Sequence, residues 1–215
     1  TGEGMVYYIG SGTAGHEIPH SQGVELDYLM VKSLNSTDQW LGTVQDGTHI
    51  AINNDNPNIA STVFTRSETY VEYDGSYTTV NTADNEYIMY YKANSQTQAI
   101  GTYAGTGTAG NFVPTFDSEG NPRKPRRVII KATEGLGGRW VSVDTRRGGT
   151  QAIYLDESVI ENNTGSFPIV FSEKGFSVDN TGSWTNTLND VYLYIVEFDT
   201  KAEAIAGGSY AWDTV

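Results

Sequence analysis

Residues 10–15 read GSGTAG and residues 105–110 read GTGTAG, and each stretch is followed four residues later by a proline, Pro19 or Pro114. Later segments recur in the same order, while the offset between them grows from 95 residues at Gly10 and Gly105 to 107 at Gly75 and Gly182. Ordered self-similarity at one period is the signature of a repeat architecture. We predict two diverged copies of one module, at residues 1–97 and 98–203, with residues 204–215 forming a tail or the start of a further repeat.

The recurring segments read as strands joined by loops of varying length. LMVK at residues 29–32 corresponds to VIIK at 128–131, and YIMY at 87–90 corresponds to YLYI at 192–195. Each LMVK-like segment is followed by a polar loop and a tryptophan, Trp40 or Trp140. An indole buries a large apolar area, so we expect both tryptophans to fill the core between two sheets.

Composition favours strands throughout. Thr, Tyr, Val and Ile fill the runs between turn residues, which include 24 glycines. These residue types are frequent in strands and tight turns. Strands at intervals of 8–12 residues are typical of a sandwich. We therefore predict an all-β protein of two tandem antiparallel β-sandwich modules, with six to eight strands each, whose only helical candidate is residues 200–205. In the second copy we expect strands at about 100–104, 127–132, 139–144, 151–155, 168–172, 175–179 and 191–198.

Charge and residue types disfavour several classes of function. With 26 acidic and 13 basic residues the net charge is −13, which disfavours binding to nucleic acid. The chain has no cysteine, no apolar run of the length of a membrane span, and three histidines that all lie in the first copy. No nucleophile elbow or metal-ligand series is present. We expect no enzymatic activity, no cofactor, no metal and no membrane insertion.

Two turn regions are candidates for glycan binding. Tyr77 and Trp184 lie in the Gly-flanked segments YDGSY and TGSW, where exposed rings could stack on a sugar. Asp74 and Asn180 would supply hydrogen bonds. The alternative is that both rings fold back over the edge of the sandwich.

Basic residues are concentrated in the second copy. Eight of the 13 lie between residues 123 and 147, whereas residues 1–96 carry twelve acidic and three basic residues. This asymmetry suggests that the basic loops meet an acidic neighbouring module or subunit, so we expect a homo-oligomer or a contact with a partner protein. The alternative is a solvated basic patch. The residues assigned to this interface are Arg123, Lys124, Arg126, Arg127, Arg139, Arg146 and Arg147.

Four elements together resemble a known group of proteins. They are the GxGTAG-like opening followed by IPH at residues 18–20, PRRVIIK at 125–131, WVSVD at 140–144, and GFSV at 175–178 with a closing YLYIV at 192–196. The arrangement resembles the uncharacterised tandem β-sandwich modules of tail-fibre and other appendage proteins of tailed bacteriophages. The first copy departs from it, because it has Leu26-Asp27-Tyr28 in place of the proline and lacks the basic loop.

The resemblance implies a lectin-like or jelly-roll-like sandwich in a virion structural protein: a tail fibre, spike or capsid-surface module that contacts other virion proteins or host glycan. The location expected is then the phage particle. The competing prediction is a secreted bacterial carbohydrate-binding or adhesin module. No catalytic residues carry over.

Overall fold

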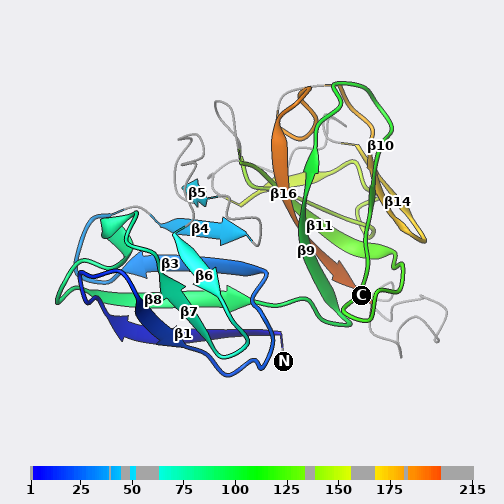
Figure 1. Ribbon diagram of the computed structural model, residues 1–215. Helices are drawn as coiled ribbons and strands as arrows, with labels where there is room; N and C mark the ends of the chain where they lie inside the picture. The colour runs from blue at the N-terminus through cyan, green and yellow to red at the C-terminus, as the bar shows by residue number, and fades with distance from the viewer. Residues whose placement is uncertain are drawn as a thin grey trace, which may run out of the picture.

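The computed structural model describes residues 2–38, 40–44, 49–51, 63–133, 139–155, 168–181 and 184–199. These residues form an all-β protein of antiparallel sheets (Figure 1). The one helical segment among them is the short 3-10 turn η1, Thr78–Val80. The helix considered at residues 200–205 and the tail at 204–215 lie outside the described residues.

The first half of the chain contains two sheets. A five-stranded sheet has the order β1-β8-β3-β4-β5, and a three-stranded sheet has the order β2-β7-β6. The strands are β1 (Glu3–Ile9), β2 (His16–Pro19), β3 (Tyr28–Ser33), β4 (Leu41–Val44), β5 (His49–Ala51), β6 (Phe64–Arg66), β7 (Tyr70–Tyr73) and β8 (Glu86–Lys92).

The second half also contains a five-stranded and a three-stranded sheet. Their orders are β9-β16-β11-β12-β13 and β10-β15-β14, which match the first half strand for strand. Sequence reasoning anticipated every strand here except β10. The strands are β9 (Gln98–Ala104), β10 (Asn111–Pro114), β11 (Pro125–Ala132), β12 (Val141–Asp144), β13 (Ala152–Tyr154), β14 (Ile169–Ser172), β15 (Gly175–Val178) and β16 (Val191–Phe198).

Each half has its own apolar core between its two sheets. Along β8 buried residues alternate with partly buried ones, so that Tyr87, Met89 and Tyr91 point into the core of the first half. This period of two is expected because successive side chains of a strand point to opposite faces of the sheet. They pack with residues of the smaller sheet such as Ile18 and Val71. The second half repeats this arrangement with its own cluster. Two antiparallel sheets around one core are consistent with a β-sandwich.

A third apolar cluster joins the halves. Tyr28 and Val44 from the first half pack with Ile100, Leu193 and Ile195 from the second. All belong to the five-stranded sheets, so the halves meet through the faces of these sheets that point away from the two cores.

The short connection between the halves is also fixed by hydrogen bonds. The backbone N–H of Asn94 donates to a carboxylate oxygen of Asp27 at 2.6 Å, and the backbone N–H of Ile100 donates to Oδ1 of Asn94 at 2.7 Å. Burial raises the pKa of Asp27 above its ordinary value, because desolvation outweighs the opposing effect of the hydrogen bond from Asn94. The two halves therefore form one packed unit.

The expectation that both repeated tryptophans fill the core between the two sheets of a sandwich is wrong. Trp140 is 8% exposed and belongs to the cluster between the halves, whereas Trp40 is 37% exposed and belongs to none of the three buried clusters. The sandwich core therefore buries neither indole. Trp140 is buried because the other half covers it.

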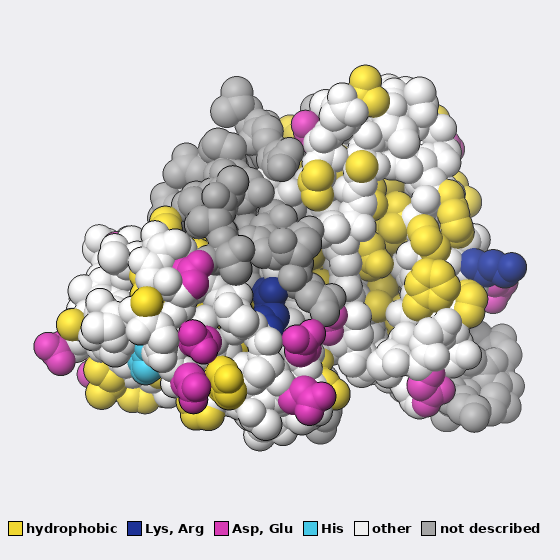
Figure 2. Space-filling model, in the orientation of Figure 1, with side chains coloured by type: hydrophobic (Ala, Val, Ile, Leu, Met, Phe, Trp, Pro, Cys, Tyr) yellow, Lys and Arg dark blue, Asp and Glu magenta, His cyan; other side chains and the backbone are white. Residues whose placement is uncertain are grey.

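The outer faces of the two three-stranded sheets differ in chemistry (Figure 2). In the second half Phe112 and Val170 flank Ser177 on this face, and both are about half exposed. In the first half the corresponding row contains Glu17 and Glu72. Apolar side chains accordingly gather over β10 and β14, and acidic ones over the first half.

Candidate functional site

Three basic residues of the second half, Arg126, Arg127 and Arg146, lie around one pocket. Arg126 and Arg127 are on β11, which pairs with β12 on one side and β16 on the other, so that Arg127 lies opposite both Asp144 and Glu197. The pocket has a volume of about 190 Å³. It is lined by Arg126, Arg127, Asp144, Thr145, Arg146 and Glu197.

Glu197 is shared between two guanidinium groups. It lies 3.2 Å from Nη1 of Arg127 and 3.5 Å from Nη2 of Arg126, and all three side chains are about one-third exposed or more. Nε of Arg127 donates to Oγ of Ser142 at 3.0 Å. Nε of Arg126 is buried and makes no hydrogen bond.

Asp144 is held ionised at the same pocket. Burial by itself would raise its pKa, but hydrogen bonds from the side chain and backbone of Arg147, its charge, and the backbone of Arg146 lower the pKa below its ordinary value. Nε of Arg147 donates to Oδ2 at 2.8 Å. The pocket thus brings three guanidinium groups, of Arg126, Arg127 and Arg146, close to the carboxylates of Asp144 and Glu197.

The size of the pocket limits what it can receive. Sites for drug-sized ligands usually have volumes of about 300–1,000 Å³, and this pocket is smaller. It therefore suits a single carboxylate-bearing side chain better than an oligosaccharide.

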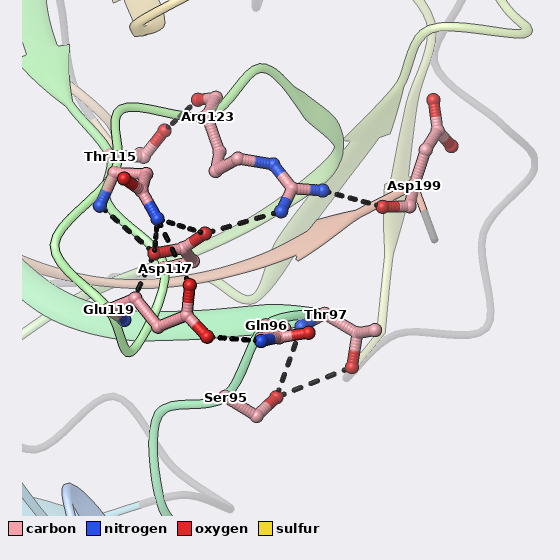
Figure 3. Close-up of polar contacts among 9 residues, drawn as sticks. Ser95, Gln96, Thr97, Thr115, Asp117, Glu119, Arg123 and Asp199 are labelled. Carbon is pink, nitrogen blue, oxygen red and sulfur yellow. Dashed lines mark hydrogen bonds and ion pairs between the residues drawn. The ribbon is translucent and has the colours of Figure 1, made fainter. Parts of the chain in front are cut away.

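Arg123 lies apart from the pocket, in a network around Asp117 (Figure 3). Its Nη1 is 3.3 Å from Oδ2 of Asp117, its Nη2 donates to the carbonyl oxygen of Asp199 at 2.7 Å, and its guanidinium lies 5.3 Å from the centre of the Phe198 ring. Oδ1 of Asp117 also accepts the backbone N–H groups of Glu119 and Asn121, both at 3.0 Å. Arg123 therefore has a structural role in closing this loop.

The same loop contacts the connection between the halves. The backbone N–H of Ser118 donates to the carbonyl oxygen of Ser95. Nε2 of Gln96 donates to Oε1 of Glu119 (Figure 3). Burial would raise the pKa of Asp117, but the hydrogen bonds from Asn121, Glu119 and Arg123 outweigh burial and lower the pKa. The ionised carboxylate of Asp117 thus helps to hold this loop in place.

The seven residues assigned to an assembly interface do not form one free basic surface. Lys124 pairs with Glu173 at 3.3 Å on the surface, and Arg123, Arg126, Arg127 and Arg147 pair with carboxylates of their own half. The structure brings Arg126, Arg127 and Arg146 together at the pocket and places Arg147 beside it. The ion pairs of Arg123, Lys124, Arg126, Arg127 and Arg147 given above all lie within the second half.

Arg139 lies with two aromatic rings instead. Its guanidinium carbon is 4.5 Å from the centre of the Trp184 ring and 5.4 Å from that of Tyr154, and these rings meet edge to face at 5.9 Å. Trp184 is partly buried against the core of the second half and adopts a φ of 130°, which is rare for a residue with a side chain. Because Arg139 stacks on the indole of Trp184, less of the indole surface is open to a sugar.

The four glycan candidates are split between the halves. Tyr77 packs against the first core, and Oδ1 of Asp74 accepts the backbone N–H of Ser76 at 2.7 Å. Nδ2 of Asn180 donates to Oγ1 of Thr185 at 2.9 Å. These contacts are those of residues that shape turns, and glycan binding at them stays a prediction.

Sequence reasoning missed a pair of buried asparagines that hold the repeated GxGTAG turns. Nδ2 of Asn81 donates to the carbonyl oxygen of Thr13, and Nδ2 of Asn186 donates to that of Thr108, at 3.0 and 2.8 Å. Both side chains are almost fully buried. The signal was available, because Asn81 and Asn186 are 105 residues apart, the offset of the YIMY and YLYI segments.

Two of the histidine side chains also make polar contacts with other residues of the first half. Nδ1 of His16 lies 2.7 Å from Oδ1 of Asn81, and Nε2 of His20 lies 3.1 Å from the carbonyl oxygen of Ser67. Over the residues that the structure describes, no three His, Cys, Asp or Glu side chains gather in a way that could hold a metal. Nor do those residues include a helix with the length and hydropathy needed to cross a bilayer.

Comparison with known families gives one match. A family model described as a domain of unknown function, DUF7483, matches residues 1–203. No curated protein and no solved structure matches the chain.

Proposed function

Because the chain belongs to the DUF7483 family of domains of unknown function, we propose its function from its architecture: a non-enzymatic structural module of a bacteriophage virion, in a tail fibre, a spike or the capsid surface. It works there as part of an assembly, with other virion proteins or copies of itself as partners. The phage setting comes from the resemblance of the short motifs described above.

One observation carries the structural role, namely that the halves are built alike and packed together. We propose that residues 1–97 and 98–203 are copies of one β-sandwich module. Their strand orders correspond, and so do their internal contacts. Tyr8 stacks on Tyr87 at 5.0 Å as Tyr103 stacks on Tyr192 at 5.1 Å. The hydroxyls of Tyr8 and Tyr103 each donate to a backbone carbonyl at 2.6 Å.

Repeated modules that pack face to face suit a load-bearing or spacing role. Contacts between repeats propagate along the chain, and the stability of the whole depends on the interfaces between neighbours. The cluster of Tyr28, Val44, Ile100, Leu193 and Ile195 supplies such an interface.

Assembly in this proposal uses the pocket of Arg126, Arg127 and Arg146. A carboxylate side chain of a partner would bind to the guanidinium groups that line this pocket. Exposed ion pairs contribute only about 0–1 kcal/mol each, so the pocket would set the register of a contact that other surfaces hold.

Antibody labelling tests the setting. An antibody raised against the chain should decorate a tail, spike or capsid surface in negative-stain images of the source particle. Particles without any label, together with chain recovered only in the medium, would contradict the proposal.

A binding assay tests the pocket. Replacing Arg126 with Gln should weaken association with virion proteins and reduce its dependence on salt, because screening lengths fall from about 10 Å at 0.1 M to 3 Å at 1 M. Lys124→Gln, which removes an exposed pair outside the pocket, is the matched control.

A second candidate is a secreted carbohydrate-binding or adhesin module. The observation that favours it is that Trp184 is only partly buried, so that part of its ring is open to a sugar even with Arg139 stacked on it. Glycan-array binding that is lost in folded Trp184→Ala and Tyr77→Ala variants would support it, and binding that is absent or unchanged would exclude these rings.

A further inference from the structure

Strand β1 presents a row of exposed apolar side chains. Met5, Tyr7 and Ile9 alternate along it and therefore share one face of the sheet. Their exposed fractions are 66%, 53% and 54%. We call these three residues the β1 stripe. Neighbouring large apolar groups left in water are a usual mark of an interaction surface.

β1 is also the end strand of its sheet. Among the described residues it pairs with β8 alone, and Figure 1 shows it at the outer edge of the first half. An uncovered edge has backbone N–H and C=O groups ready to pair with another strand. Native proteins commonly protect such an edge with charged residues or proline, and the β1 stripe has neither.

The β1 stripe continues the surface through which the two halves meet. Met5 lies opposite Tyr90 on β8, and Tyr90 lies opposite Met30 on β3. Met30 and Tyr90 pack against the cluster between the halves. One apolar face therefore runs across the sheet, with its inner part covered by the second half and its outer part, at β1, uncovered.

The strand of the second half that corresponds to β1 is β9, and it is partly covered. Ile100 lies opposite Ile195 on the strand that corresponds to β8, so it occupies the position of Met5. Ile100 is only 7% exposed, because the first half packs on it. The next outward-facing residues, Thr102 and Ala104, are exposed and small or polar. β9 is thus apolar only where it is covered, whereas the row on β1 carries three consecutive exposed apolar residues after Glu3, whose carboxylate is paired with Lys92.

We infer that a second copy of this chain covers the β1 stripe, through antiparallel pairing of β1 with β1 about a two-fold axis. With Tyr7 at the axis, Met5 of each copy faces Ile9 of the other. Apolar groups then meet apolar groups, as an isologous contact requires, and the edge strands satisfy each other's backbone groups. The β1 stripe has no charge with which to recognise a charged partner. This inference stands apart from the function proposed above, which uses the basic pocket.

Electrostatics gives this dimer a characteristic salt dependence. Residues 1–96 carry twelve acidic and three basic residues, so two first halves repel each other. Added salt screens that repulsion and leaves the apolar contact in place. Dimerisation through the β1 stripe should therefore strengthen with salt, whereas a contact through the arginine pocket should weaken.

Light scattering and sedimentation on the full chain test the inference. We expect a dimer that is favoured at high salt, is lost in Tyr7→Lys and persists in Thr102→Lys, the matched substitution on β9. Both side chains are exposed, and circular dichroism would confirm that the variants fold. A monomer at every salt and protein concentration would overturn the inference, as would equal loss of the dimer in both variants or a dimer that only weakens with salt.

A cross-link gives a second readout. The chain has no cysteine, so Tyr7→Cys places a single thiol at the proposed axis, where two Cβ atoms come close enough for a disulfide. Mild oxidation should link Tyr7→Cys chains into dimers and leave Thr102→Cys chains unlinked. Equal yields from the two variants would refute the pairing of β1 with β1.

Discussion

Replacing Asn186 with Ala tests the role of the buried asparagines. Oδ1 of Asn186 accepts the backbone N–H of Thr106 at 2.9 Å. Its Nδ2 donates to the carbonyl oxygens of Thr108 at 2.8 Å and Asn180 at 2.7 Å. Oδ1 also accepts from Nδ2 of Asn111 at 3.0 Å and from Oγ1 of Thr106 at 3.4 Å. Alanine removes all of these hydrogen bonds from a site that is 0% exposed.

The expected loss follows from the groups left without partners. A buried polar group that loses its hydrogen bond costs about 1–3 kcal/mol. Thr106 and Thr108 are exposed residues, so water can reach part of their backbone, and the largest cost comes from the carbonyl of Asn180. We therefore expect Asn186→Ala to lower the free energy of unfolding by roughly 2–4 kcal/mol.

Denaturant unfolding followed by circular dichroism measures this loss. Thr108→Ala is the control on the same turn, because the exposed Thr108 side chain donates only to Oγ1 of Thr106 and its removal should change stability by less than about 0.5 kcal/mol. Asn81→Ala should also destabilise, since Asn81 holds the first turn through the corresponding backbone groups of Ser11 and Thr13. A loss in Asn186→Ala no larger than in Thr108→Ala would refute the reasoning.

Four further changes have definite expected outcomes. Arg139→Ala should shift the emission of Trp184 and cost about 0.5–2 kcal/mol, the usual range for a cation–π contact; unchanged emission would contradict the stacking. Ionised Asp117 contributes stability that is complete above its ordinary pKa of 3.8 and is lost as the pH falls through the lowered pKa of the folded state. Asp117→Asn should therefore flatten the acid limb of a curve of stability against pH. An unaltered acid limb would count against this role of Asp117. Leu193→Ala, at a fully buried position between the halves, should cost about 2–5 kcal/mol and, in a thermal scan, separate the unfolding of the two halves; a single unshifted transition would argue against the interface. Gly105→Ala should destabilise, because a Cβ there would overlap a backbone carbonyl of the facing loop, and wild-type stability would show that the loop can move.

Local patterns in the sequence predicted the all-β class and most strands. Alternating apolar residues reveal a strand because side chains of a strand point to opposite faces. β10 was missed because its four residues, Asn111–Pro114, include one buried side chain and a proline. The glycine-rich turns could be recognised as turns, but the asparagines that hold them lie about 70 to 80 residues away along the chain.

Only the tertiary structure decided which surfaces are covered and which charges are paired. Trp40 and Trp140 follow similar segments, yet only Trp140 is covered by the other half. The excess of arginine in the second half suggested a free basic surface, but strands β11, β12 and β16 bring Glu197 and Asp144 beside Arg127. Such outcomes depend on which strands become neighbours and which sheet faces meet. Those contacts join residues far apart along the chain, so local residue patterns determine the strands themselves, and packing between them determines burial and charge pairing.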